Sequence, residues 1–121
     1  MFILNTEIGM PAYAIGLLRD VDFNAEIIEY VSNIEDTMKP FGGRFLVHGT
    51  HAEIIEGTMN DDCVIIEFPS IDQAQQWYAS PAYRKLIPLR TCNSKGAVFL
   101  VDGVSDNYSA LSLVEKMAAS T

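Results

Sequence analysis

The chain has 121 residues, of which 49% are hydrophobic and 20% charged, a balance typical of a single globular domain rather than of a disordered segment. Sixteen acidic residues against eight basic ones give a formal net charge of −8, which repels nucleic acids and anionic lipid surfaces. The longest apolar stretches are far shorter than the roughly 20 residues that span a bilayer. Neither nucleic acid nor a membrane is therefore expected as a partner.

The start of the chain and its cysteines indicate the cellular compartment. Residues 1–9, treated as an N-terminal extension, lack the basic segment and small-residue cleavage site of a secretory signal. Whether the physiological chain starts at Met1 or Met10 is left open. Cys63 and Cys92 are too few for a disulfide framework. A cytoplasmic location is expected.

The first predicted elements are a strand and a helix. Large and small apolar residues alternate over residues 11–18, which predicts a strand. Apolar residues recur at spacings of three and four over residues 23–38, which predicts an amphipathic helix whose apolar face carries Phe23, Ile27, Tyr30, Val31, Ile34 and Met38. Asp20 or Asp22 is expected to cap this helix.

Two further strands are predicted in the middle of the chain. A glycine pair supplies a turn, and residues 44–48 alternate like a strand. A short extended piece over residues 52–56 is expected next. The β-branched run at residues 63–68 is the most strand-like segment of the chain.

The second half of the domain repeats the helix-then-strand order. Ser70, followed three residues later by Gln73, predicts a capping box that opens a second helix. Pro81 is expected to start a separate helical turn. The apolar run at residues 97–101 predicts the final strand.

The resulting order predicts an α+β, ferredoxin-like fold, β-α-β-β-α-β, with an antiparallel sheet that carries its helices on one face. The apolar residues of the opposite face would be exposed in a monomer, so two sheets are expected to pair in a dimeric α/β-barrel. A homodimer is the expected partner arrangement.

Residues 105–121 are predicted to form a C-terminal helical extension that begins near Asn107 or Ser109. Apolar residues recur along it at helical spacing. This helix is expected either to clasp the partner subunit, or else to pack on its own domain or fray, and the pattern does not separate these outcomes.

Five segments together resemble one known family. They are residues 10–13 (MPAY), 41–47 (FGGRFLV), 56–57 (EG), 65–70 (IIEFPS) and 77–83 (WYASPAY). In this order they are similar to the family called domain of unknown function 1330, over a domain at residues 10–104. The sequence departs from the family at His48-Gly49-Thr50, where an arginine and two glycines are usual.

The resemblance implies a dimeric α/β-barrel fold and no particular activity. That fold is shared with cofactor-free monooxygenases, some isomerases and dehalogenase-like proteins, whose ligands lie between the sheet and the helices or inside the barrel. Shared fold is an argument by association about chemistry.

A group of polar residues is a candidate catalytic site. If Arg44 lies opposite Glu67 on neighbouring strands, then His48 lies opposite Cys63 and all four share one sheet face. Tyr13 has the parity to join them. His48 or Glu67 would act as base, and Arg44 would bind a carboxylate or enolate of a small substrate. The alternative is that Arg44 and Glu67 form a structural ion pair, with Tyr13 as packing.

Residues around the second helix form a second candidate group. Trp77 and Tyr83 are either core residues or a platform for substrate. Arg90, just beyond them, either binds an anion or makes a surface salt bridge.

No cofactor or metal is expected. The sequence has no nucleotide-binding glycine loop, nucleophile elbow or flavin fingerprint, and the spacing of its histidines and cysteines matches no recurrent metal motif. The hypothesis is a cofactor-independent enzyme that acts on a small organic molecule. The alternative is a non-catalytic binding or structural homodimeric module.

Overall fold

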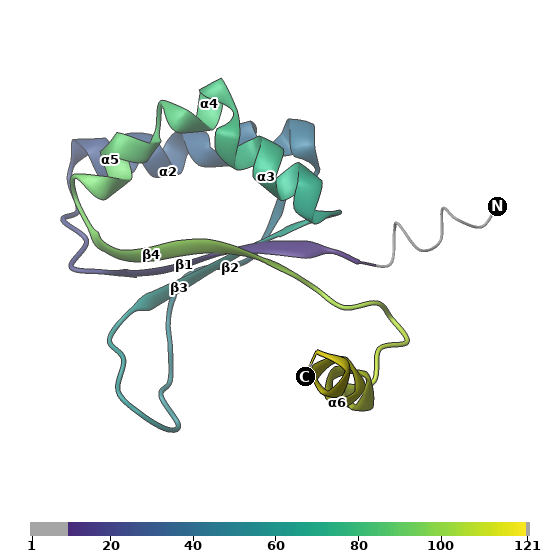
Figure 1. Cartoon of the computed structure of the whole chain (residues 1–121). Helices are drawn as coiled ribbons and strands as arrows, with labels where there is room; N and C mark the ends of the chain where they lie inside the picture. The colour runs from purple at the N-terminus through teal and green to yellow at the C-terminus, as the bar shows by residue number, and fades with distance from the viewer. Residues whose placement is uncertain (1–9, 121) are drawn as a thin grey trace.

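The structure is a computed structural model that describes residues 10–120 (Figure 1). The predicted N-terminal extension at residues 1–9 lies outside these described residues. In chain order the elements are β1 (Ala12–Arg19), α2 (Ala25–Met38), the short 3-10 helix η1 (Lys39–Phe41), β2 (Arg44–His51), β3 (Asp62–Phe68), α3 (Ile71–Ala79), α4 (Pro81–Arg84), α5 (Ile87–Thr91), β4 (Lys95–Asp102) and α6 (Ala110–Ala119).

The four strands form one antiparallel sheet in the order β2-β3-β1-β4. Helices α2, α3, α4 and α5 pack on one face of this sheet (Figure 1). None of them covers the opposite face, which is called the open face below. The α+β, ferredoxin-like fold predicted from the order of the elements is confirmed.

The core lies between the sheet and these helices. Small residues of the central strand β1, Ala12 and Ala14, let the helices approach the sheet closely. The large residues that fill the remaining space are Met38, Phe68, Trp77 and Tyr83, and each of them is at most 1% exposed.

Both long helices of the domain start at side-chain caps. Ser70 accepts a hydrogen bond from the backbone N–H of Gln73 at 3.3 Å, as the predicted capping box requires. Helix α2 is capped by Asn24, whose Oδ1 accepts from the Ile27 N–H at 3.0 Å. The prediction that Asp20 or Asp22 caps α2 is wrong, because the helix starts later than the apolar pattern indicated.

Strand β2 departs from the predicted register. Arg44 lies opposite Glu67 as predicted, but the pairing then shifts twice, so that His48 lies opposite Val64 instead of Cys63. Each shift is a β-bulge, which adds one residue to β2 and turns the following side chains to the other face. The prediction that His48 shares a face with Arg44 and Glu67 is therefore wrong.

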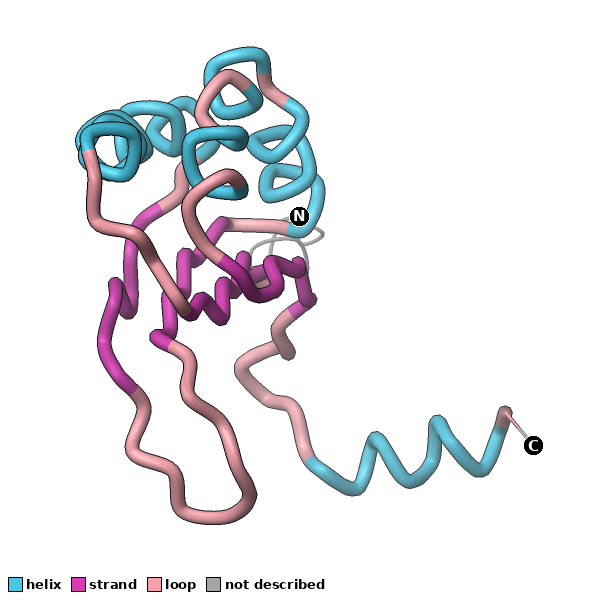
Figure 2. The backbone as a smooth tube through the Cα atoms, turned by 90° about the vertical axis from the view of Figure 1, so that its left-hand side faces the viewer, coloured by secondary structure: helices cyan, strands magenta, loops and turns pink. Residues whose placement is uncertain are grey.

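The connection between β2 and β3 also differs from the prediction. Strand β2 continues to His51, and residues 52–61 form a loop without strand structure. The predicted extended piece at residues 52–56 belongs to this loop. The loop hangs on the side of the sheet opposite the helices (Figure 2).

Helix α6 stands apart from the sheet and from the other helices, on the same side of the sheet as the loop at residues 52–61 (Figures 1 and 2). Ser109 caps it, as one of the two predicted starts requires. Its apolar side chains are exposed, including Leu111 at 66%, Val114 at 61% and Met117 at 61%. The alternative in which this helix packs on its own domain is wrong. Among residues 10–120 no helix is long and apolar enough to cross a membrane.

Candidate functional site

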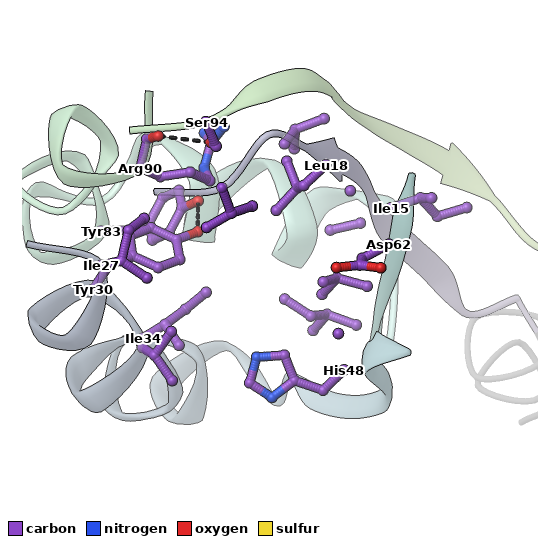
Figure 3. A pocket seen from close by; sticks show the side chains of 18 of the residues that line it. Ile15, Leu18, Ile27, Tyr30, Ile34, His48, Asp62, Tyr83, Arg90 and Ser94 are labelled. Atoms are coloured by element: carbon purple, nitrogen blue, oxygen red, sulfur yellow. Dashed lines mark hydrogen bonds between the residues drawn. The ribbon is translucent and has the colours of Figure 1, made fainter. Parts of the chain in front are cut away.

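A cavity of about 220 Å³ lies between the sheet and the helices (Figure 3). Its floor comes from small and branched residues of the sheet, and its roof comes from the buried face of α2. The apolar residues that line it include Ala14, Gly16, Leu18, Val64, Ile66 and Val98 from the strands, and Ile27, Val31 and Ile34 from α2. Gly16 of β1 contributes no side chain to the floor, and a Cβ at this position would meet no atom closer than 3.7 Å, so space remains between the sheet and α2.

One end of the cavity is polar. The hydroxyl groups of Tyr30 on α2 and Tyr83 on α4 lie 2.6 Å apart and share a hydrogen bond. The guanidinium of Arg90 on α5 lies 5.9 Å from the centre of the Tyr30 ring, and Figure 3 places all three residues on the same side of the cavity. Three helices thus bring two phenols and one cation together.

Arg90 is buried without a carboxylate partner. The residue is 9% exposed, its Nε has no hydrogen-bond partner, and no ion pair within residues 10–120 involves it. It therefore does not make the surface salt bridge that was one of the two predictions for it. A buried charge without a counter-ion costs free energy, so this guanidinium is the unusual feature of the cavity.

The surroundings of Tyr30 and Arg90 shift the pKa values of both groups. Burial, together with the nearby Tyr83 hydroxyl, raises the pKa of Tyr30 far above its ordinary value. Burial lowers the pKa of Arg90, but attraction to the oxygens of Tyr83 and Tyr30 outweighs this and the pKa is raised. At neutral pH the site therefore contains a protonated phenol and a charged guanidinium.

A single hydroxyl, that of Ser80, positions two of the residues that line the cavity. Its Oγ donates to the Trp77 carbonyl at 2.7 Å and accepts from the Tyr83 N–H at 3.3 Å. The Trp77 ring is fixed in addition by a hydrogen bond from its Nε1 to the Oγ1 of Thr37 at 2.9 Å. Both aromatic rings are buried, as core residues are, and both line the cavity.

His48 lines the cavity from β2, on the side away from the two phenols (Figure 3). Its ring stacks on Phe45, with the ring centres 4.1 Å apart and the planes 8° from parallel. The first bulge of β2 is responsible, because it turns His48 to the helix side. His48 remains exposed at the edge of the cavity.

The other predicted polar group lies on the open face of the sheet. Arg44 Nη2 is 2.8 Å from Glu67 Oε1, and Arg44 Nε donates to the same oxygen at 3.0 Å. The Tyr13 hydroxyl donates to Glu67 Oε2 at 3.5 Å. Arg44, Glu67 and Tyr13 are thus together, as predicted, but His48 is on the opposite face.

The prediction from sequence missed Tyr30. The helical pattern assigned this residue to the apolar face of α2. Its ring does lie on that face and lines the cavity, but its hydroxyl makes a polar contact that the pattern did not indicate. A tyrosine on a buried helical face needs a partner for its hydroxyl, and this need was the available signal. Within residues 10–120, no three histidine, cysteine, aspartate or glutamate side chains gather in a way that could hold a metal ion.

Solved structures confirm the class of fold. The chain is similar to RPA0582, a protein of unknown function from Rhodopseudomonas palustris, with 18% identity and a TM-score of 0.58 over 78% of this chain and 81% of that chain. A dimeric ferredoxin-like protein of unknown function from Jannaschia sp. CCS1 matches with 12% identity and a TM-score of 0.54, covering 78% and 97% of the two chains. A dimeric ferredoxin-like protein of unknown function from Thermobifida fusca matches with 14% identity and a TM-score of 0.51, covering 79% and 92%.

These likenesses define the chain as an α+β protein of ferredoxin-like fold. The family described as domain of unknown function (DUF1330) matches residues 11–104, and the chain belongs to this family. The resemblance found in the sequence is therefore confirmed. None of the proteins with curated functions matches the chain.

Proposed function

We propose that this protein binds a small organic molecule in the cavity between its sheet and its helices. The observation that carries the proposal is a largely apolar cavity of about 220 Å³ that ends at a buried arginine without a carboxylate partner. A cavity of about 150 Å³ holds benzene, so this one has room for a six-membered ring with a short substituent. Apolar walls with a few polar groups at one end are typical of sites for small ligands.

The polar group on the open face is assigned a structural role in this proposal. Glu67 already receives hydrogen bonds from Arg44 and Tyr13, so its charge is satisfied without a ligand. An ion pair of this kind at the sheet surface adds specificity to the pairing of strands β2 and β3 more than it adds stability. The substrate role considered for Arg44 is thereby transferred to Arg90.

The proposal includes a homodimer formed through the open face of the sheet. A row of apolar side chains, Val47, Ile65, Ile15 and Phe99, crosses all four strands on this face. Phe99 is 40% exposed in the isolated chain. Exposed apolar rows of this kind are stabilised by burial against a second sheet. The proteins from Jannaschia sp. CCS1 and Thermobifida fusca, which share the fold, are described as dimeric, and this supports a dimer here without indicating its face.

Helix α6 is proposed to pack on the partner subunit. It lies on the side of the sheet where the second subunit would sit, together with the loop at residues 52–61 (Figure 2). The exposed apolar residues of this loop, Ile54 and Ile55, and those of α6 would then flank the partner. Burial in the dimer gives these side chains the cover that their own domain does not supply.

Fluorescence of Trp77 tests the binding proposal directly. Trp77 is the single tryptophan of the chain and lines the cavity. A neutral probe, phenylacetamide, is titrated against the wild-type protein and a Gly16→Leu variant. Gly16 lines the cavity, and its added Cβ would make only ordinary contacts, the nearest at 3.7 Å, so the leucine extends into the empty space.

The wild-type protein is expected to show a saturable change in fluorescence, and Gly16→Leu is expected to abolish it. Gly16→Ala is the matched control, because one methyl group leaves most of the cavity open and binding should persist. Equal binding by wild type and Gly16→Leu would place the probe elsewhere and contradict the proposal.

Proton transfer by His48 is a second candidate function, favoured by its position at the edge of the cavity. An imidazole near a bound organic anion can remove a proton from it at neutral pH. A turnover whose pH profile disappears in His48→Gln, with ligand binding retained, would support catalysis. Binding without turnover over a broad panel of small organic acids and amides would favour a binding module.

A further inference from the structure

We infer that the ligand of this cavity is a small organic monoanion, a carboxylate or an enolate, whose oxygen accepts hydrogen bonds from Arg90 and from one of the two phenols. The inference rests on the proposed binding function, and it adds the chemical class of the ligand. Three independent features of the polar end of the cavity lead to it.

The first feature is the unused donor capacity of Arg90. A guanidinium carries five N–H donors and no acceptor, and its Nε–H is buried without a partner. Leaving a buried charged donor unsatisfied is costly, so this donor requires a partner such as a ligand or an ordered water. The groups beside it are the hydroxyls of Tyr30 and Tyr83, and neither residue supplies a carboxylate as a counter-ion.

The second feature is the pair of phenols. Two hydroxyl groups joined by one hydrogen bond of 2.6 Å use one of their two protons, so the second O–H is free to donate. Burial raises the pKa of Tyr30, which keeps its proton in place at neutral pH. The polar end therefore offers donors from both Arg90 and a phenol.

The third feature is the contrast between this end and the rest of the molecule. The formal net charge is −8, so the overall field repels anions, and any preference for an anion must come from direct contact. The walls beyond the polar end are mostly aliphatic and aromatic, with His48 and Asp62 on the side opposite the phenols. The apolar part matches a ring or short chain that carries the anionic group at one end.

Calorimetric titration with a matched pair of probes tests the inference. Phenylacetate and phenylacetamide have nearly the same shape and differ in charge. In the wild-type protein the acid is expected to bind at least about tenfold more tightly than the amide, because hydrogen bonds to charged groups are the stronger ones. Chloride is titrated alone as a control for a small inorganic anion.

Three arginine variants distinguish direct contact with Arg90 from a general effect of charge. Arg90→Met should remove the preference for the acid while amide binding stays within about threefold, because the apolar walls remain. Arg84→Met, in which an exposed arginine of α4 is replaced by the same residue, should leave both affinities unchanged. Arg90→Lys keeps a charge at the site, should retain part of the preference, and covers the case in which Arg90→Met does not fold.

Failure of the inference and failure of the proposed function give different results. Amide binding equal to or tighter than acid binding would overturn the anion inference and leave the cavity as a binding site. An acid preference that survives in Arg90→Met would also overturn it. If neither probe binds to the wild-type protein, the proposed function itself fails. Chloride that binds as tightly as phenylacetate would show a site for inorganic anions instead.

Discussion

At the scale of single residues, Tyr30 connects the cavity to the stability of the fold. Its hydroxyl is buried beside Tyr83, and burial raises its pKa above the value of about 10 that an unfolded tyrosine has. As the pH rises above about 10, the unfolded chain loses this proton first, so the stabilising contribution is progressively lost. Below that pH the contribution is fully present.

A Tyr30→Phe variant is expected to lose about 1 kcal/mol at pH 7, because one buried hydrogen bond disappears. Its stability should fall less steeply than that of the wild type between pH 9 and pH 11, since the titrating group is gone. Urea unfolding across this range measures both effects. Tyr108→Phe, at an exposed residue, is the control, and parallel pH profiles for wild type and Tyr30→Phe would contradict the assignment.

Individual residues were predictable from sequence to different degrees. The pairing of Arg44 with Glu67 was assumed as the register of two neighbouring strands, and the structure has it. The position of His48 did not follow, because one bulge reverses the parity of every residue beyond it. Tyr30 was assigned to the right face of its helix without its polar role. The pattern of a single sequence predicts which face of a helix a residue lies on. It does not predict which group a buried hydroxyl will contact.

At the scale of elements, the two bulges of β2 determine which of its residues line the cavity. The second of its two bulges includes Gly49, whose φ of 74° lies in the left-handed region. A Cβ at this position would contact nothing within 4 Å, so any effect of a substitution comes from the backbone alone. Gly49 is therefore a clean probe of the bulge.

Gly49→Ala is expected to destabilise the fold by about 1–2 kcal/mol, the cost of placing a residue with a Cβ in the left-handed conformation. Gly49→Asn should cost clearly less, because asparagine tolerates this conformation. The urea midpoint of each variant gives the comparison. Equal stability of all three proteins would show that the bulge does not have this backbone geometry.

The elements themselves were largely predictable. Strong alternation identified β1 and β3, and the capping box at Ser70 located α3, since both signals are local. The cap of α2 and the length of β2 were missed because they depend on contacts with distant segments. Asn24, for example, donates to Asn93 at 2.7 Å across the end of the sheet, which no local pattern could indicate.

At the scale of the whole molecule, the open face of the sheet and α6 predict a dimer. Phe99→Lys would place a charge in the apolar row across the four strands, and the protein is expected to become monomeric without unfolding. Analytical ultracentrifugation measures the change. Phe23→Lys is the matched control, because Phe23 is 79% exposed and lies just before α2, outside the strands that carry the apolar row.

Removal of residues 105–121 should weaken the same dimer, since it removes the apolar residues of α6, while the circular dichroism of the sheet is retained. A wild-type protein that sediments as a monomer at high micromolar concentration would contradict the dimer proposal.

The fold class and the dimer proposal could both be predicted from the order of the elements and from the apolar residues on both faces of the sheet, whereas the cavity could not. Its volume depends on how Ala14, Gly16 and α2 pack in three dimensions.

The most direct test of the central claim is a methyl NMR titration of isoleucine-labelled protein with phenylacetamide. Binding in the cavity predicts that the methyl signals of Ile27, Ile34 and Ile66, which line it, shift and saturate together. The signals of Ile54 and Ile55, in the exposed loop between β2 and β3, should stay in place. Shifts confined to the loop, or no saturable shift at the three cavity residues, would contradict the claim that this cavity is the binding site.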